Sequence, residues 1–398
     1  MPASASIPAT SSIEVTIERI LPGGVGLAHA EGRTLFVALA APGDVVRARL
    51  DQIRGKLAFA SIEEIITPSP VRIEPPCPYF GRCGGCDFQQ LNYQAQLDAK
   101  VEIIRDCLHR IARIEELPEI SITSSPQQWH YRARANWQYD SRTKALGYFE
   151  RGSHTVCDVA ECAVLAPELQ ETFASLREQI DALPEELREV EAAAGDEGVA
   201  LAPPLVGLSN CDVSRKIGDE IYYFNAEAFF QTNCELLDSL VAEAIGDDRG
   251  DSALDLYCGV GLFTLPLARR FARVVGVETN ATAARFARRN LRSAQLMNAE
   301  VVTARVSDWL KAHAQSFGAV DLLLLDPPRT GLESGGIEKI LAMKPRRISY
   351  VSCDPATLAR DLKKLIAGGY TLDSIAAFDM FPQTHHVETV VQLDRPMT

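Results

Sequence analysis

The sequence of 398 residues lacks a long hydrophobic run. No stretch approaches the roughly 18 to 20 uninterrupted apolar residues of a membrane-spanning helix, and residues 1–12 contain neither the basic segment nor the apolar core of a secretion signal. We therefore expect a cytoplasmic protein without a membrane partner. Ten cysteines in such a chain argue against a disulfide framework, so thiols, metal ligands or a nucleophile are the interpretations to test.

Positive charge is also scarce, because the formal net charge is −13. This value at first disfavours a nucleic-acid partner, since phosphates attract Lys and Arg. Residues 161–250, however, contain 20 acidic and 5 basic residues, whereas the rest of the chain contains 33 acidic and 35 basic residues. The acidity therefore belongs to one segment, and the remaining chain is compatible with RNA binding.

Two regions precede the C-terminal half of the chain. Residues 12–68 alternate apolar and polar residues between Gly and Pro turns, which predicts a five-stranded Greek-key barrel of the OB type, either an oligonucleotide-binding module or a structural appendage. Residues 69–224 contain a long amphipathic helix over 90–114. In residues 128–154 aromatic and basic residues alternate, which suits an RNA-binding face or, equally, a core opposite a charged surface. Residues 165–200 are acidic and Ala-rich and are predicted to form a helical, solvated linker.

Residues 225–398 alternate apolar strands with helices, a pattern that predicts a doubly wound, mainly parallel α/β sheet. Its first strand ends at Tyr257 and leads into a turn with Gly259 and Gly261. Glu278, 19 residues after Gly259, ends the next strand, where an acid accepts hydrogen bonds from ribose hydroxyls. The third glycine of a dinucleotide fingerprint is replaced by Thr264, which favours an adenosyl ligand without phosphates, such as S-adenosylmethionine.

Two further motifs follow later strands of this sheet. Asp326-Pro327-Pro328 is similar to the (Asp/Asn)-Pro-Pro-aromatic loop of nitrogen-directed methyltransferases, but Arg329 replaces the aromatic residue, which indicates another acceptor or a plain structural turn. Cys353 ends the next strand and precedes a helix. A thiol beside a helix N-terminus is expected to have a lowered pKa, so Cys353 is a candidate nucleophile, the alternative being inert packing.

A cysteine cluster lies near the start of the central region. Cys77, Cys83 and Cys86 have the spacing Cys-x5-Cys-x2-Cys on a Gly-rich loop, which favours metal ligation. With Cys162 or Cys157 as a fourth ligand, four thiolates could hold a [4Fe–4S] cluster or a structural zinc. A cluster with four cysteine ligands has no open iron, so we expect a structural or RNA-positioning role.

The order of these motifs resembles the RNA (uracil-5-)-methyltransferase family along nearly the whole chain. The runs that carry the resemblance are FFQTN, LDLYCGVG, GVE, LLDPPRTG, YVSCDPATLARD and FPQTHHVETV. The resemblance implies a Rossmann-like class I methyltransferase domain at 225–398 and a TRAM domain at 12–68. It implies an iron–sulfur and RNA-binding domain at 69–224, with Cys162 as the fourth cluster ligand because residues 162–167 match the family there.

The resemblance also assigns roles to single residues. Cys353 would add to carbon 6 of uracil, and Glu388 would remove the proton from carbon 5 after methylation. A common asparagine of the glycine-rich turn is Leu262 here, so its polar contact is absent or supplied elsewhere, and Arg329 could contact an RNA phosphate. Residues that match the family's S-adenosylmethionine site are Gln231, Tyr257, Glu278 and Asp326.

Several alternatives remain open from the sequence. A TRAM-like domain with four cluster cysteines favours 23S ribosomal RNA over transfer RNA as the substrate. The enzymatic rival is a nitrogen-directed methyltransferase that needs no cysteine nucleophile. The other rival is a non-catalytic, RNA-binding iron–sulfur protein. The sequence predicts no protein partner.

Overall fold

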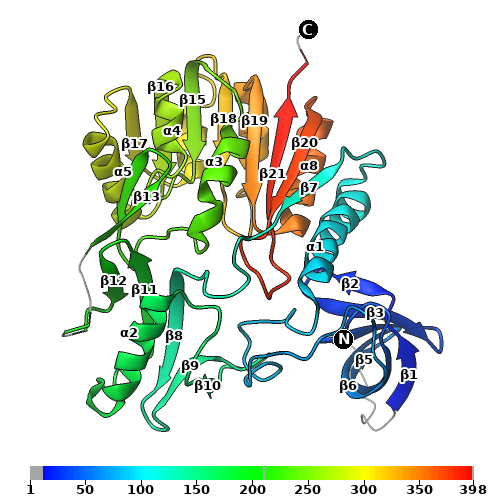
Figure 1. Cartoon of the computed structure of the whole chain (residues 1–398). Coiled ribbons are helices and arrows are strands. Elements are labelled where there is room, and N and C mark those ends of the chain that lie inside the picture. The colour runs from blue at the N-terminus through cyan, green and yellow to red at the C-terminus, as the bar shows by residue number, and fades with distance from the viewer. Residues whose placement is uncertain (1–11, 206, 209–211, 397–398) are drawn as a thin grey trace, which may run out of the picture.

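The computed structural model describes residues 12–205, 207–208 and 212–396. These residues form four sheets, of six, five, two and eight strands (Figure 1). The nine cysteines in these ranges are free thiols. Within the same ranges, no helix combines the length and the apolar character that crossing a bilayer requires.

The N-terminal sheet has six strands in the order β1-β5-β6-β4-β3-β2. The first of the five predicted strands is divided into β1 and β2, which pair with different strands. At the division the Ile17 amide donates to the Asp44 carbonyl, next to β5, and the Glu18 amide donates to the Leu27 carbonyl of β3. The consecutive strands β1 and β2 thus form opposite edges of a curved sheet around one small core. The strands are β1 (Ser12–Thr16), β2 (Arg19–Leu21), β3 (Val25–Ala30), β4 (Arg33–Ala38), β5 (Val45–Arg54) and β6 (Leu57–Thr67).

The central sheet has five antiparallel strands in the order β10-β9-β8-β11-β12, and helix α2 covers one face. Trp137 and Tyr139 point into this covered face, where Trp137 packs on Phe173 with ring centroids 5.0 Å apart. For these two aromatic residues, core packing is therefore the correct interpretation; Phe149 remains exposed. The elements are β8 (Arg134–Asp140), β9 (Ala145–Phe149), β10 (Val156–Asp158), α2 (Pro167–Glu178), β11 (Glu189–Gly195) and β12 (Gly198–Ala202).

The prediction of a solvated helical linker at residues 165–200 is wrong. Only α2 and a 3-10 turn at Ile180–Ala182 are helical, and β11 and the start of β12 complete the segment. Leu169 and Val190 are fully buried in the central core. The run of alanines misled the prediction because small side chains also suit a strand that packs closely against neighbouring layers.

The C-terminal sheet has eight strands in the order β17-β16-β15-β18-β19-β21-β20-β7. Strands β15 to β19 are mutually parallel, whereas β21 runs antiparallel to β19 and to β20. The predicted doubly wound sheet is therefore confirmed. Its strands are β7 (Ile120–Thr123), β15 (Gly250–Leu256), β16 (Phe271–Glu278), β17 (Ala299–Thr303), β18 (Leu322–Leu325), β19 (Arg347–Ser352), β20 (Thr371–Phe378) and β21 (Glu388–Asp394).

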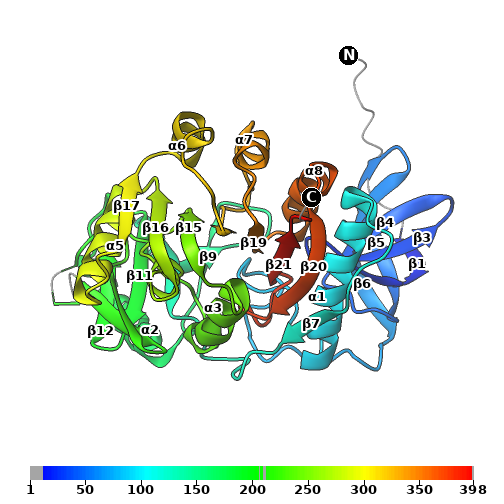
Figure 2. The ribbon, with the colours of Figure 1, turned by 90° about the horizontal axis from the view of Figure 1, so that it is seen from above.

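Helices cover both faces of this sheet, as the view from above shows (Figure 2). Leu322 and Leu324 pack on one face while Leu323 and Leu325 pack on the other, so a strand buried on both sides is leucine throughout. One face carries α3 (Leu237–Ile245), α4 (Thr264–Ala268), α5 (Ala281–Ser293) and the hairpin of β13 (Val213–Ile217) and β14 (Glu220–Phe224). The other carries α1 (Tyr93–Cys107), α6 (Val306–His313), α7 (Gly336–Met343) and α8 (Pro355–Ala367).

The predicted helix over 90–114 is α1, followed by a π-helical turn at Leu108–Ala112. Asn92 caps its first turn by accepting a hydrogen bond from the Ala95 amide at 3.0 Å. The helix packs on the C-terminal sheet beside α8, and β7 then joins that sheet as its last strand, parallel to β20. A segment far from the C-terminal half in sequence thus completes the C-terminal sheet.

A buried ion pair fixes α1 to the loop between β20 and β21. Lys100 and Asp379 have no exposed side-chain surface, and the Lys100 ammonium donates both to Asp379 and, at 3.0 Å, to the Phe381 carbonyl. The Tyr93 hydroxyl donates to the other Asp379 oxygen at 2.8 Å. Burial lowers the pKa of Lys100, and the Asp379 carboxylate opposes this effect.

We expect Lys100→Met to destabilise the protein by about 3 to 5 kcal/mol, because it leaves Asp379 buried without its counter-charge. The double variant Lys100→Met/Asp379→Asn should recover part of this loss. The measurement is the free energy of unfolding in urea. Equal stability of wild type and Lys100→Met would contradict the anchoring role.

Candidate active site

One edge of the C-terminal sheet collects all six residues that the sequence assigned to catalysis and cofactor binding. They line a single cavity of about 850 Å³. Parallel strands place their carboxyl ends at the same edge, and β21 runs in the opposite direction, so its first residue reaches that edge as well. The six residues are Gln231, Tyr257, Glu278, Asp326, Cys353 and Glu388.

The glycine-rich turn forms one wall of the cavity. Tyr257, Gly259 and Gly261 all have positive φ angles, of 69°, 54° and 93°. The two glycines adopt them without strain, whereas this conformation is uncommon for a residue such as Tyr257. The Glu278 carboxylate accepts hydrogen bonds from the amides of Gly259 at 2.9 Å and Asn280 at 2.6 Å. Glu278 is thereby held in place, with lone pairs left for ribose hydroxyls.

The same wall offers polar groups to a ligand. The Tyr257 hydroxyl is buried and has no hydrogen-bond partner within the described ranges, as expected where a bound molecule supplies one. Leu262 is 6% exposed and lines the cavity as an apolar residue. The turn is supported instead by Asn290, which donates to the Val260 carbonyl at 2.9 Å, and by Tyr222, whose hydroxyl donates to the Leu262 carbonyl at 3.0 Å.

The Asp-Pro-Pro-Arg loop is fixed against α8. The Thr357 hydroxyl donates to the Arg329 carbonyl at 2.9 Å, and Arg360 donates to the Thr330 carbonyl at 3.1 Å. Gly331 has φ +73°, and a Cβ there would lie 2.3 Å from the Thr357 side chain. The loop therefore cannot move away from α8 without breaking contacts, and it keeps Asp326 and Arg329 in the cavity wall.

The pKa of Cys353 is raised to about 12, mainly by burial and then by the Glu388 carboxylate, while Arg329 opposes the shift. The expectation of a lowered pKa at a helix N-terminus is therefore wrong. The Asp354 carboxylate already caps α8 by accepting from the Thr357 amide at 2.7 Å, which places a negative charge at that terminus. Arg329 is the cation that favours the Cys353 thiolate.

Carboxylates in and beside the cavity also have raised pKa values. Burial raises the pKa of Asp326 to about 7, and the charges of Asp255 and Glu278 add to the shift. Burial and the Asp326 charge raise the pKa of Glu388 well above its usual range, with Arg329 again opposing. The cavity thus combines the Cys353 thiol with two buried carboxyl groups and the Arg329 guanidinium, whose charges influence one another, as nucleophilic and acid–base chemistry requires.

Sequence reasoning missed several other residues that line this cavity. Arg132 comes from the segment before β8, and Phe229, with 58% of its surface exposed, is the first residue of the run FFQTN, two positions before Gln231. Phe381 and His386 belong to the flagged run FPQTHHVETV, so their motif was the available signal. Burial lowers the pKa of His386 to about 3, so this imidazole is neutral at physiological pH.

The four predicted metal ligands, Cys77, Cys83, Cys86 and Cys162, line a second, smaller cavity of about 30 Å³. Cys157 does not line it; its sulfur accepts instead from the Arg82 guanidinium at 3.2 Å. Two buried polar atoms beside the cavity, Arg132 Nε and the Tyr148 hydroxyl, have no hydrogen-bond partner in the described part of the chain. Unpaired donors beside several thiols suit an anionic group held by thiolates.

Among the described residues, no three His, Cys, Asp or Glu side chains lie close enough together to hold a single metal ion. Zinc would require four sulfurs about 2.3 Å from one centre. A four-iron cluster is bound through several irons, so its cysteine sulfurs stand farther apart. Four cysteine thiols are the ligand type of a structural zinc site and of a [4Fe–4S] cluster alike.

Comparison with known proteins identifies the family. The family model described as tRNA (Uracil-5-)-methyltransferase matches residues 211–396. The 23S rRNA (uracil(1939)-C(5))-methyltransferase of Pectobacterium atrosepticum is 32% identical over 97% of this chain and 94% of its own. The enzyme of the same description from Alkalilimnicola ehrlichii is 33% identical over 96% of both chains.

A solved structure agrees with these matches. The tRNA (uracil-54, C5)-methyltransferase of Pyrococcus abyssi, in complex with S-adenosyl-L-homocysteine, superposes with a TM-score of 0.73 and 26% identity over 96% of this chain and all of that one. The chain therefore belongs to the S-adenosylmethionine-dependent RNA (uracil-5-)-methyltransferases.

Proposed function

We propose that this protein methylates carbon 5 of a uridine in 23S ribosomal RNA through a covalent bond between Cys353 and the base. The observation that carries the proposal is that Cys353 and Glu388 face the cavity that also contains Tyr257 and Glu278. A nucleophile, a base and a cofactor site thus surround one space. The target uridine must leave its stack to enter this space, at a cost of a few kcal/mol that is smaller in a loop.

In the proposed mechanism Cys353 acts first. Its thiolate, favoured by Arg329, forms a bond to carbon 6 of uracil and pushes electron density to carbon 5. Carbon 5 then takes the methyl group from the sulfonium of S-adenosylmethionine, which leaves as S-adenosylhomocysteine. Glu388 next accepts the proton from carbon 5, and the bond between carbon 6 and the Cys353 sulfur breaks to return the thiolate.

The cofactor assignment rests on four residues. Glu278 is held by backbone amides and retains acceptors for the ribose, and the Tyr257 hydroxyl lacks a protein partner. Gln231 and Asp326 line the same cavity. The homocysteine-bound form of the Pyrococcus abyssi relative supports S-adenosylmethionine as the methyl donor.

Ribosomal RNA is proposed over transfer RNA because the relatives described as 23S enzymes are 32% to 33% identical, compared with 26% for the transfer-RNA enzyme of known structure. The curved N-terminal sheet supports a TRAM-like, OB-type RNA-binding module at residues 12–68. We also propose residues 69–224 as the iron–sulfur and RNA-binding domain and 225–398 as the methyltransferase domain, with α1 and β7 of the first range packed into the second domain. A cytoplasmic location is proposed with the RNA substrate.

Cys353→Ala should lower 5-methyluridine formation by about a thousandfold or more, because no covalent adduct can form. The measurement is nucleoside mass spectrometry after incubation with S-adenosylmethionine and, separately, unmodified ribosomal and transfer RNA. Cys234→Ala, a partly buried cysteine outside the cavity, is the matched control and should retain activity. A methylated amine, or activity in Cys353→Ala, would reject the covalent route; product in transfer RNA alone would reject the proposed substrate.

Glu388→Gln should stop the reaction after methyl transfer, since the amide cannot take the carbon 5 proton. The expected result is an RNA–protein adduct that survives denaturing electrophoresis and carries label from the methyl group of S-adenosylmethionine. Adding Cys353→Ala should remove the adduct. Full turnover by Glu388→Gln would show that another group is the base.

We further propose a [4Fe–4S] cluster held by Cys77, Cys83, Cys86 and Cys162. These four thiols line one cavity, and Arg132 beside it offers an unpaired donor. Iron–sulfur clusters bound by four thiolates carry electrons or stabilise structure. Because Arg132 also lines the catalytic cavity, the cluster here would position the walls of the substrate site.

Cys162→Ala should reduce the iron and acid-labile sulfide content of anaerobically purified protein, whereas Cys157→Ala should leave both at the wild-type level. The two cysteines lie five residues apart, so this pair separates ligation from general disturbance of the loop. The measurements are iron and sulfide analysis and visible absorption. Iron loss in Cys157→Ala with none in Cys162→Ala would reverse the assignment.

A further inference from the structure

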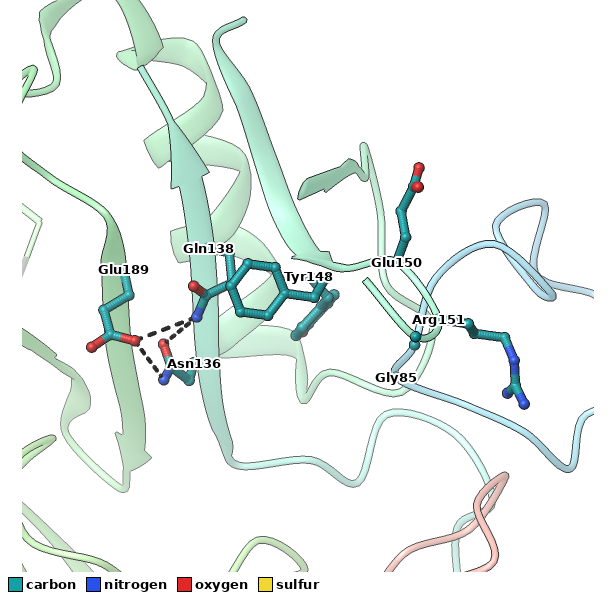
Figure 3. A pocket seen from close by; sticks show the side chains of 10 residues that line it. Gly85, Asn136, Gln138, Tyr148, Glu150, Arg151 and Glu189 are labelled. Carbon is teal, nitrogen blue, oxygen red and sulfur yellow. Dashed lines mark hydrogen bonds between the residues drawn. The ribbon is translucent and has the colours of Figure 1, made fainter. Parts of the chain in front are cut away.

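A groove of about 820 Å³ lies on the open face of the central sheet, opposite the face that carries Trp137 and α2 (Figure 3). Neither catalysis nor cofactor binding uses it. Side chains from β8, β9 and the start of β11 line it together with the cysteine loop. The lining residues that matter here are Gly85, Asn136, Gln138, Phe149, Arg151 and Glu189.

Three polar side chains form a connected wall of this groove. The Asn136 amide donates to Glu189 Oε2 at 3.1 Å, and the Gln138 amide donates to Asn136 Oδ1 at 3.2 Å and to Glu189 Oε2 at 3.4 Å (Figure 3). Two acceptors, Gln138 Oε1 and Glu189 Oε1, have no hydrogen-bond partner among the described side chains. The wall therefore presents acceptors to a ligand.

An aromatic ring stands beside these acceptors. Gln138 pairs with Gly147, so Phe149, two residues further along β9, lies on the same face of the sheet. Its surface is 38% exposed, and His154 packs on it at right angles with centroids 5.3 Å apart. A large apolar ring held in one orientation at the surface is a platform on which a base can stack.

The groove is continuous with the catalytic cavity. Gly84 and Gly85 line both spaces, and the Gly84 amide donates to the Phe149 carbonyl at 2.9 Å. A Cβ on Gly84 would lie 3.0 Å from that carbonyl oxygen, a contact so tight that β9 would have to shift by a few tenths of an ångström. Arg151 lies at the end of the groove near Gly85 and forms no ion pair with any described residue. An RNA strand with its uridine in the cavity can pass over the two glycines, with Arg151 near its phosphates.

We propose that this groove binds an unpaired nucleotide of the substrate RNA near the target uridine, with its base stacked on Phe149 and its exocyclic amino group donating to Gln138 and Glu189. This inference rests on the proposed function and deepens it by naming a second base-reading site. Adenine, cytosine and guanine carry such an amino group. Uracil has no exocyclic amino group, and carbonyl oxygens flank its single N3–H donor, so it is disfavoured beside two acceptors.

The test uses the full-length protein and the shortest RNA fragment that wild type methylates. Phe149→Ala should raise KM about tenfold with little change in kcat, as expected for the loss of one stacked base. Phe149→Tyr keeps the ring and should restore wild-type KM. Arg142→Ala is the control, because this side chain is 90% exposed in the turn between β8 and β9 and lies outside the groove. Circular dichroism melting checks that each variant folds.

A scan of abasic substitutions through the RNA locates the bound nucleotide. At one position other than the target, the abasic substitution should weaken RNA binding by wild type about tenfold but should not weaken binding by Phe149→Ala any further. Uridine at that position should also weaken binding by wild type. The inference would be overturned if the abasic substitution and Phe149→Ala weakened binding additively, or if Phe149→Ala kept the wild-type KM. In either case, 5-methyluridine formation by wild type would still uphold the proposed function. If wild type formed no 5-methyluridine in any RNA, both would fall.

Discussion

The catalytic cavity depends on the buried ion pair between Lys100 and Asp379. Asp379 begins the loop that ends at Glu388, and this loop must keep one conformation for Glu388 to face Cys353. The loop is also bound to the cysteine segment: the Asp87 and Phe88 amides donate to the Gln383 carbonyl at 3.1 and 3.0 Å. Burying the Lys100 ammonium without a counter-charge would cost several kcal/mol, so α1 is stable in this position only when it packs against the loop that carries Asp379.

The direction of the last strands explains how one edge of the sheet gathers groups from distant parts of the sequence. In a wholly parallel sheet the first residue of β21 would lie at the opposite edge from Cys353. Because β21 is antiparallel, Glu388 begins where β18 and β19 end. The same reversal brings the loop before Glu388 against the cysteine loop, where the Asp87 carboxylate accepts from the His385 amide at 2.8 Å. The antiparallel direction of β21 thus places the loop that leads to Glu388 in contact with the cysteine segment.

Much of this arrangement could be predicted from the sequence, for identifiable reasons. Leucine runs such as 322–325 and glycines before helices are local signals, so the α/β sheet and the turn after Tyr257 were predictable. The pKa of Cys353 was not, because it depends on burial and on Glu388, which is 35 residues away in sequence. Likewise β11 was mistaken for part of a helical linker, because the packing of its alanines depends on neighbours that the local pattern does not reveal. The roles of the six cavity residues remain predictions that their convergence supports.

The path of α1 and β7 has a consequence for dissecting the molecule. The family model matches residues 211–396, which suggests a self-contained catalytic half. Yet Ile104 and Leu108 pack in the same core as Leu358 and Leu362, and β7 covers the edge of β20. A fragment without residues 92–123 would expose both an apolar face and an open strand edge, the two features that promote aggregation. The boundary of the matching family model is therefore not a boundary of folding.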